Sequence, residues 1–191
     1  MYAENRGMNA ARNSAPAKSA KPVDLDRYVP AYLTWIANKL SRGASQHYLN
    51  LFDVGIETWR CLVLLAIEGS ISAQQVSKVI GLDKASVSRC FKAMQETGLI
   101  RVELDPNDGR ARVAMLTPKG RALHDQIRDV ALERERAFLS VLTKQEIETL
   151  IGLLRRLHEN LPAVEAATQV YIDKNYPNAS KRPRKRAPEE E

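Results

Sequence analysis

The sequence predicts a mainly α (α+β) protein that carries one small β-hairpin. Over most of the chain, apolar residues recur every three or four positions, and Ser, Thr or Asp stands where helices would begin. The period changes to two only around residues 100–115, on either side of a turn-forming segment. The 191 residues are 44% hydrophobic and 27% charged, which is the composition of a globular chain.

The first two helices are predicted from the spacing of their apolar residues. One amphipathic set runs through Leu25, Tyr28, Val29, Tyr32, Leu33, Ile36 and Leu40. Residues 56–68 form a second helix that is apolar almost all round and is therefore buried.

Two shorter helices follow directly. Ser72 and Gln75 form a capping box, in which each side chain accepts a hydrogen bond from the backbone of the other residue. This helix ends at Gly81. Asp83 can cap the next helix, which runs to about Thr97.

The hairpin comes next. Residues 100–104 and 112–115 alternate between apolar and polar or small side chains, and residues 105–109 (DPNDG) have turn chemistry. Two strands alone are only marginally stable, so the hairpin must pack against the helices.

The C-terminal half is predicted to be helical. Thr117 and Pro118 start a long helix that extends to about Val141. Thr143 and Glu146 form a second capping box. The last helix carries apolar residues on more than one stripe, and Pro162 discourages its continuation. These apolar residues are Ile147, Leu150, Ile151, Leu154, Leu157 and Leu161.

The order of these elements includes a helix-turn-helix followed by a β wing, which is a winged helix-turn-helix with helices on either side. The folded domain spans 23–162, and further helix up to about residue 176 is compatible with the pattern. Its parts are a winged-helix lobe at 55–117 and flanking helices at 23–54 and 118–162. Residues 1–22 are predicted to be a disordered arm, and 163–191 a C-terminal extension with a basic tail, either solvated or touching DNA phosphates.

The net charge and the apolar runs of the chain indicate which partners and which compartment to expect. The formal charge is +6 and the pI near 9.4, which favours polyanions, although such a charge also serves solubility. The longest apolar run, residues 61–67, is too short to cross a bilayer, and residues 1–22 lack the apolar stretch of a secretory signal, so we expect neither feature. Two cysteines are too few for a disulfide framework, so we expect a cytoplasmic protein.

A helical wheel of residues 84–96 indicates which face could read DNA. Val87, Cys90, Phe91 and Met94 fall on one apolar face directed at the core. The opposite face and the positively polarised start of the helix suit binding in a DNA major groove. The alternative is that this face is polar only because it is exposed to solvent. The candidate DNA-binding residues there are Lys84, Ser86, Ser88, Arg89 and Lys92.

The hairpin tip offers a second contact. Arg110 follows the tight turn and Arg112 lies nearby, so a guanidinium there could enter a minor groove. Asp108 is close enough in sequence to hold Arg110 in place. The alternative is an Asp–Arg pair that merely decorates a turn.

These stretches resemble the MarR family of winged-helix multiple-antibiotic-resistance regulators. The wing is the most specific part: Asp108-Gly-Arg110, then Leu116-Thr117 and Gly120, resemble the pattern D-x-R followed by L-T-x-x-G. The resemblance covers roughly 23–162 and includes Gly55 to Arg60, Ser86 to Arg89, Met94 and Gly98 to Ile100. It implies a winged helix-turn-helix with flanking dimerisation helices, in which 55–117 is the DNA-binding lobe and 23–54 and 118–162 form the homodimer. This homodimer would bind a pseudo-palindromic operator, by default as a repressor. The alternative is that the leucines of the last helix pack within one chain.

The resemblance also implies an effector. Asn38 to Ser45, Tyr48 and Glu57 to Arg60 look like regulators of aromatic-acid catabolism, some of which sense acyl-CoA thioesters. A small anionic aromatic acid or its CoA thioester is the expected effector. Aromatic and cationic candidates for its site are Trp35, Arg42, His47, Tyr48, Trp59 and Arg60. Either tryptophan could instead belong to the core, and His47 could be an ordinary surface residue.

Three other functions are weighed against this one. Redox sensing through Cys61 and Cys90 is disfavoured, because burial makes a thiol sluggish. An enzyme is not expected, since no catalytic motif or cofactor site is found, and His124 with Asp125 is interpreted as a solvated pair. A helical interaction adaptor without specific DNA binding remains the alternative from another class.

Overall fold

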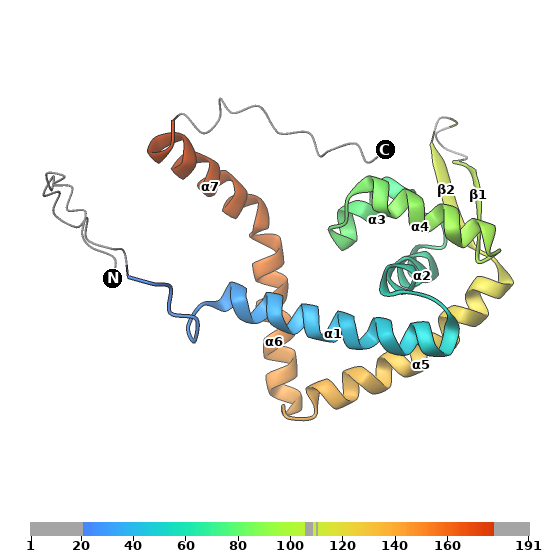
Figure 1. The fold of residues 1–191 in the computed structure, drawn as a ribbon, viewed down its shortest axis with the longest axis horizontal. Helices are drawn as coiled ribbons and strands as arrows, with labels where there is room; N and C mark the ends of the chain where they lie inside the picture. The colour runs from blue at the N-terminus through green and yellow to red at the C-terminus, as the bar shows by residue number, and fades with distance from the viewer. Residues whose placement is uncertain (1–20, 106–108, 110, 178–191) are drawn as a thin grey trace, which may run out of the picture. The chain divides into compact units, whose positions relative to one another are not determined.

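The computed structural model describes residues 21–105, 109 and 111–177. In chain order, its elements are α1 (Val29–Phe52), α2 (Ile56–Glu68), α3 (Ala73–Ile80), α4 (Lys84–Glu96), β1 (Ile100–Leu104), β2 (Arg112–Leu116), α5 (Pro118–Leu139), α6 (Lys144–Glu159) and α7 (Leu161–Asn175) (Figure 1). Contacts divide the chain into two compact units, Met1–Ile127 and Arg128–Glu191. The predicted mainly α fold with one hairpin is confirmed.

Both predicted capping boxes are present. The Ser72 hydroxyl accepts a hydrogen bond from the Gln75 amide at 3.3 Å, and the Gln75 side chain accepts one from the Ser72 amide at 2.9 Å. Thr143 and Glu146 make the same reciprocal pair, with 2.7 Å between the Thr143 amide and the Glu146 carboxylate. Each box satisfies amides that the first turn of a helix leaves without partners.

The first helix begins later than its apolar set predicts and ends within the predicted range of 23–54. It begins at Val29, with Pro30 in its first turn, so Leu25 precedes it. It then continues to Phe52 and stops where Asp53 adopts a left-handed conformation, φ 56°. The apolar spacing continues after Leu40 through Ala44 and Tyr48, which are the buried residues of this helix.

The last predicted helix ends near Pro162, and a second helix follows it. α6 ends at Glu159 and α7 begins at Leu161, with Pro162 in its first turn. Proline interrupts a helix because it lacks the amide donor, yet it fits the first turn of the next one. The predicted end of this helix near Pro162 is therefore confirmed, and α7 is the further helix up to about residue 176 that the sequence pattern allows.

The core of the first unit is built around α2. Leu62 and Leu65 are fully buried, together with Val76 of α3, Val87 of α4 and Ile127 of α5. Among the helices in the described ranges, none has the length and apolar content that a membrane span would need.

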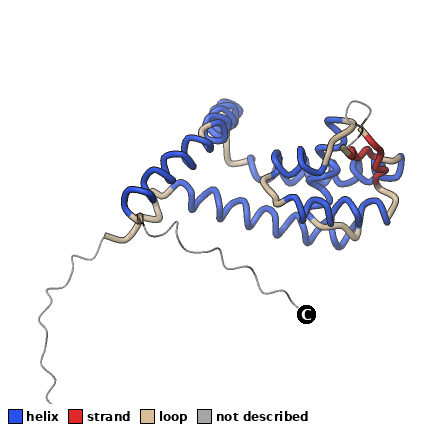
Figure 2. Tube along the Cα trace, turned by 90° about the horizontal axis from the view of Figure 1, so that it is seen from above, coloured by secondary structure: helices blue, strands red, loops and turns tan. Residues whose placement is uncertain are grey.

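The hairpin is attached to this core by a third short segment. β1 and β2 pair antiparallel, from Ile100 opposite Leu116 to Leu104 opposite Arg112. Ile71, just before α3, exchanges two backbone hydrogen bonds with Ala114, at 2.9 and 3.1 Å. The strands lie at the edge of the helices of the first unit (Figure 2). This bridge supplies the support that the sequence requires of the hairpin.

Candidate nucleic-acid interface

The turn between α3 and α4 has a well-defined local geometry. Gly81 ends α3 in the left-handed region, φ 69°, which glycine adopts at little steric cost. The Ser77 hydroxyl donates a 2.6 Å hydrogen bond to the Leu82 carbonyl. Together they fix the direction in which α4 leaves the turn.

A chain of hydrogen bonds holds a guanidinium at the start of α4. The Asp83 carboxylate accepts hydrogen bonds from the Ser86 amide, at 2.9 Å, and from the Ser86 hydroxyl, at 2.6 Å. Arg89 in turn donates to the Ser86 hydroxyl oxygen at 2.9 Å. The Ser86 hydroxyl and amide hold the pKa of Asp83 below its usual value, and Arg89 adds to this effect. The same set of hydrogen bonds therefore caps α4 and orients Arg89.

The two faces of α4 separate as the helical wheel predicts. Val87, Phe91 and Met94 are buried, whereas Lys84, Ser88, Arg89 and Lys92 are exposed and Ser86 is half-buried. Lys92 lies 3.9 Å from Glu96, but both side chains are mostly exposed, so this pair leaves the lysine free to meet another anion. The exposed face can thus present cations and hydroxyls to a polyanion.

The predicted wing contact lies only partly within the described residues. Arg112, the first residue of β2, is exposed. Asp108 and Arg110 are outside the described residues, so their contact with each other stays a prediction. At the base of the tip, the Asp105 amide donates to the Ala111 carbonyl at 2.9 Å.

The base of the hairpin is joined to the C-terminal end of α4. The Thr117 hydroxyl donates to the Gly98 carbonyl at 2.7 Å and accepts from the Gly120 amide at 3.0 Å. Lys119 donates to the Thr97 carbonyl at 2.8 Å. These contacts connect the hairpin, the start of α5 and α4, which fixes the hairpin relative to the exposed face of α4.

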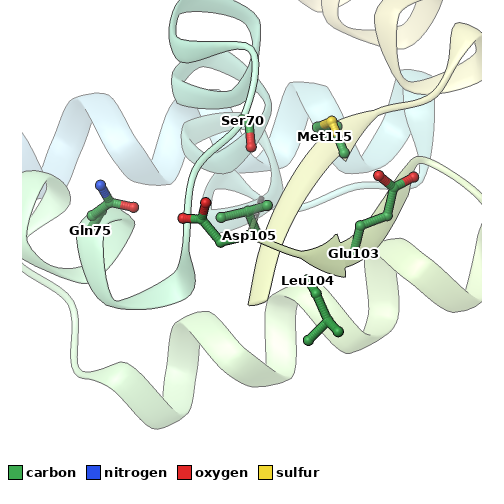
Figure 3. A pocket seen from close by; sticks show the side chains of 7 residues that line it. Ser70, Gln75, Glu103, Leu104, Asp105 and Met115 are labelled. Atoms are coloured by element: carbon green, nitrogen blue, oxygen red, sulfur yellow. The ribbon is translucent and has the colours of Figure 1, made fainter. Parts of the chain in front are cut away.

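Two cavities flank this region. One, of about 390 Å³, lies between the hairpin and the residues around the start of α3 (Figure 3). Its lining includes the carboxylates of Glu103 and Asp105, which disfavour a phosphate there. The other, of about 400 Å³, is lined by Phe52, Leu99 and Lys119 among others. No predicted effector residue lines either cavity.

Two of the predicted effector residues meet in an aromatic group. The rings of Tyr48 and Trp59 pack edge to face with centroids 6.0 Å apart. Trp59 also stacks on His124 of α5, with centroids 5.5 Å apart. Tyr48 is buried and Trp59 half-buried. The group joins α1, α2 and α5 within the first unit.

His124 was not among the predicted site residues, and its interpretation as part of a solvated pair is wrong. Its ring nitrogen Nδ1 does lie 2.8 Å from the Asp125 carboxylate, but only 13% of its side chain is exposed. The ring is covered because it stacks on Trp59. The sequence contains no local signal for this contact, which depends on how α2 and α5 pack.

The remaining predicted effector residues are dispersed. Arg60 donates a 3.0 Å hydrogen bond to the Ser41 hydroxyl of α1 and is half-buried. Arg42 and His47 are exposed, and Trp35 packs against Tyr32 at 5.8 Å. Trp35 lies about 20 Å along α1 from Tyr48, at about 1.5 Å per residue. Trp35 and Tyr48 of one chain therefore do not line one small site.

Comparison with known proteins finds transcriptional regulators that this chain resembles. The family model described as "MarR family" matches residues 52–111. A MarR/EmrR family transcriptional regulator from Acinetobacter sp. ADP1, solved by crystallography, is 33% identical, with a TM-score of 0.69 over 74% of this chain and 99% of that one.

Two more distant relatives agree with this result. The HTH-type transcriptional regulator YdgJ of Bacillus subtilis (strain 168) is 30% identical over 108 residues, which are 55% of this chain and 64% of that protein, less than two thirds of its length. A mutant MarR from E. coli, solved in complex with operator DNA, is 22% identical, with a TM-score of 0.60 over 68% of this chain and 92% of that one. The latter likeness concerns the fold.

Proposed function

The chain belongs to the MarR family of transcriptional regulators, and we propose that it is a sequence-specific DNA-binding regulator whose α4 enters the major groove of its operator. The observation that carries this proposal is the exposed Arg89 guanidinium, held by Ser86 and, through it, by Asp83. A guanidinium oriented in advance loses little side-chain entropy when it binds the O6 and N7 atoms of guanine.

The residues around Arg89 support the same docking. Lys84, at the positively polarised start of α4, and Lys92 are exposed cations that suit phosphate contacts. Ser88 adds an exposed hydroxyl that can reach a base edge or a phosphate. Under this proposal the wing, with Arg110 and Arg112, enters the adjacent minor groove.

We propose that the regulator acts as a homodimer on a pseudo-palindromic operator. The support is the apolar surface that each unit exposes: Leu33 and Ile36 on α1, and Leu154 and Leu157 on α6, are 40–49% exposed. Apolar faces of this kind mark protein interfaces. A twofold axis would place two copies of α4 about one helical turn of DNA apart, or a multiple of it.

We further propose that the protein is a repressor released by a small anionic aromatic effector, an aromatic acid or its CoA thioester. The aromatic group of Tyr48, Trp59 and His124 supports this proposal, because it offers stacking partners where α1, α2 and α5 meet. Arg60, on the same helix as Trp59, supplies a cation for a carboxylate or phosphate. An effector bound there would act on the packing of α2, which also contacts α4.

The proposal of DNA binding is tested by selection and titration. The full-length protein is used to select fragments from random double-stranded DNA, and binding of the selected site is followed by fluorescence anisotropy against scrambled DNA at several salt concentrations. We expect selection of an inverted repeat, affinity for it at least a hundred-fold above scrambled DNA, and a steep loss of affinity with salt. Sequence-indifferent binding throughout would favour the interaction adaptor instead.

A further inference from the structure

α7 (Leu161–Asn175) is a helix that its own chain leaves almost uncovered. Of its 15 residues, only Ile172 is half-buried and the others are exposed. A helix of this length is marginal by itself in water, and most of its stability comes from the packing of an apolar face. The segments outside the described residues carry few large apolar side chains, which are Met1, Tyr2 and Met8. The partner that stabilises α7 is therefore expected in another molecule.

The residues of α7 separate into a polar and an apolar stripe. At about 100° per residue, Glu165, Gln169 and Asp173 fall on one side of the helix. The Gln169 amide donates a 2.8 Å hydrogen bond to the Asp173 carboxylate, which keeps this side supported within the helix. The opposite side is apolar over an arc of about 120°. This apolar stripe of α7 consists of Ala163, Val164, Ala167, Val170 and Tyr171, of which the valines and the tyrosine are 46–69% exposed.

The apolar stripe has the same spacing in both directions from Ala167. Its members lie three and four residues before Ala167, and three and four residues after it. In an antiparallel pair of identical helices with a twofold axis beside Ala167, each position meets the mirror position of the other copy. Ala163 then comes opposite Tyr171, and Val164 opposite Val170. A small residue thus faces a large one, as close packing requires, whereas a parallel pair would place tyrosine on tyrosine.

The charges near the two ends of α7 fit the same register. Lys174 lies one helical turn beyond Val170 on the apolar side. In the antiparallel pair it comes opposite Asn160 of the second copy, next to Glu159 at the end of α6. Within the described part of the chain, neither Lys174 nor Glu159 has an ion-pair partner. The register therefore brings two complementary charges together at each end of the pair.

We propose that the apolar stripe of α7 is a contact surface for α7 of a second copy of this chain, in an antiparallel pair whose twofold axis passes beside Ala167. This pairing rests on the proposed homodimer, to which it adds a surface separate from the apolar faces of α1 and α6. Both copies use the same residues, so the contact closes at two chains. A partner of another sequence would not explain why the stripe matches its own reverse.

The position of the axis is tested by cross-linking full-length variants with a short bismaleimide. We expect Ala167→Cys to give a covalent dimer in which peptide mass identifies a link from position 167 to position 167. Ala166→Cys is the matched control, because the neighbouring alanine lies about 100° round the helix. Its cross-link should form at least ten-fold more slowly. Equal rates, or no link between the two copies of position 167, would overturn the proposal.

The direction of the pair is tested by mixing two variants, Ala163→Cys and Tyr171→Cys. In the antiparallel pair, position 163 of one copy lies opposite position 171 of the other. We therefore expect links between the two variants to exceed links within either variant by at least ten-fold, as judged by peptide mass. A preference for links between like positions would show a parallel pair and contradict the proposal.

The contribution to association is measured by sedimentation velocity over a dilution series. Ala167→Arg places two like charges at the axis, so we expect self-association at least ten-fold weaker than in the wild type. Ala166→Arg carries the same charge outside the stripe and should stay within two-fold. Circular dichroism confirms that both variants keep their helix content. A monomeric wild type would make the proposed homodimer wrong, whereas a dimeric wild type that Ala167→Arg leaves unchanged would make only the α7 pairing wrong.

Discussion

Gly120, in the first turn of α5, lies directly against the backbone of Leu99, the residue before β1. A Cβ at position 120 would stand 2.9 Å from the Leu99 carbonyl carbon and closer still to its oxygen. The same Leu99 carbonyl accepts a hydrogen bond from the Thr117 amide at 3.0 Å. The segment from Thr117 to Gly120 therefore closes the base of the hairpin, which explains in physical terms why the sequence has threonine and glycine at this spacing.

We expect Gly120→Ala to be strongly destabilising. The new methyl group would collide with backbone atoms that cannot rotate away, so the cost is about 3 kcal/mol, at the upper end of what overpacking typically produces. Urea unfolding at fixed protein concentration, followed by circular dichroism, measures the free energy of unfolding. The control is Gly152→Ala in α6, where an added Cβ meets nothing within 4 Å. The control should be neutral or gain up to about 1 kcal/mol from helix propensity. Equal stability of the two variants would contradict this interpretation.

The features predicted correctly from the sequence are those fixed by nearby residues. The boxes of Ser72 and Thr143 join residues three positions apart, and the bounds of α2 follow from its own apolar run. The alternation around residues 100–115 predicts the hairpin because side chains on a strand point to opposite faces in turn.

The features that the sequence did not predict depend on residues that are distant along the chain. The stacking of Trp59 on His124 requires α2 and α5 to pack together, and the contact between the Thr58 hydroxyl and the Cys90 sulfur, 3.9 Å apart, requires α2 and α4 to do so. No local spacing encodes either contact. The bridge from Ile71 to Ala114 is of the same kind, since the need for support could be predicted but the supporting segment could not.

We expect Arg89→Ala to weaken binding of the selected operator by roughly 1–3 kcal/mol and to relax the preference at one base pair of each half-site. The reason is the loss of an oriented guanidinium and not of general positive charge. Anisotropy titrations with the operator and with single base-pair variants measure both effects. Arg136→Ala is the matched control, because Arg136 is an exposed arginine of α5 paired with Glu133. If both variants lost the same affinity without a change of base preference, α4 would not read bases through Arg89.

Replacement of Trp35 by phenylalanine leaves Trp59 as the single tryptophan, since the chain has two. We expect the emission of this variant to change when an aromatic acid or its CoA thioester binds, because a ligand between Tyr48, Trp59 and His124 must alter the stacking on the indole. Fluorescence titration gives the affinity. The reciprocal variant, Trp59→Phe, keeps an aromatic ring but reports only from Trp35, so its emission should not respond. A ligand that releases DNA and changes Trp35 emission alone would place the effector site elsewhere.

The alkylation rate of Cys90 should follow the fraction of thiolate, with its half-maximum at the Cys90 pKa of about 7 instead of the ordinary 9.0. The sign follows from the neighbours of Cys90, because the Cys61 thiol and the Thr58 hydroxyl lower the Cys90 pKa and the rate therefore rises at a lower pH. Thr58→Val removes one donor and should raise the Cys90 pKa. Glu57→Gln removes a carboxylate whose charge disfavours the thiolate, so it should lower that pKa. The measurement is the initial rate of iodoacetamide labelling against pH, with the modified residue identified by peptide mass, and C90S as the blank. A wild-type half-maximum near pH 9, or opposite shifts in the two variants, would show that Cys61 and Thr58 do not activate Cys90.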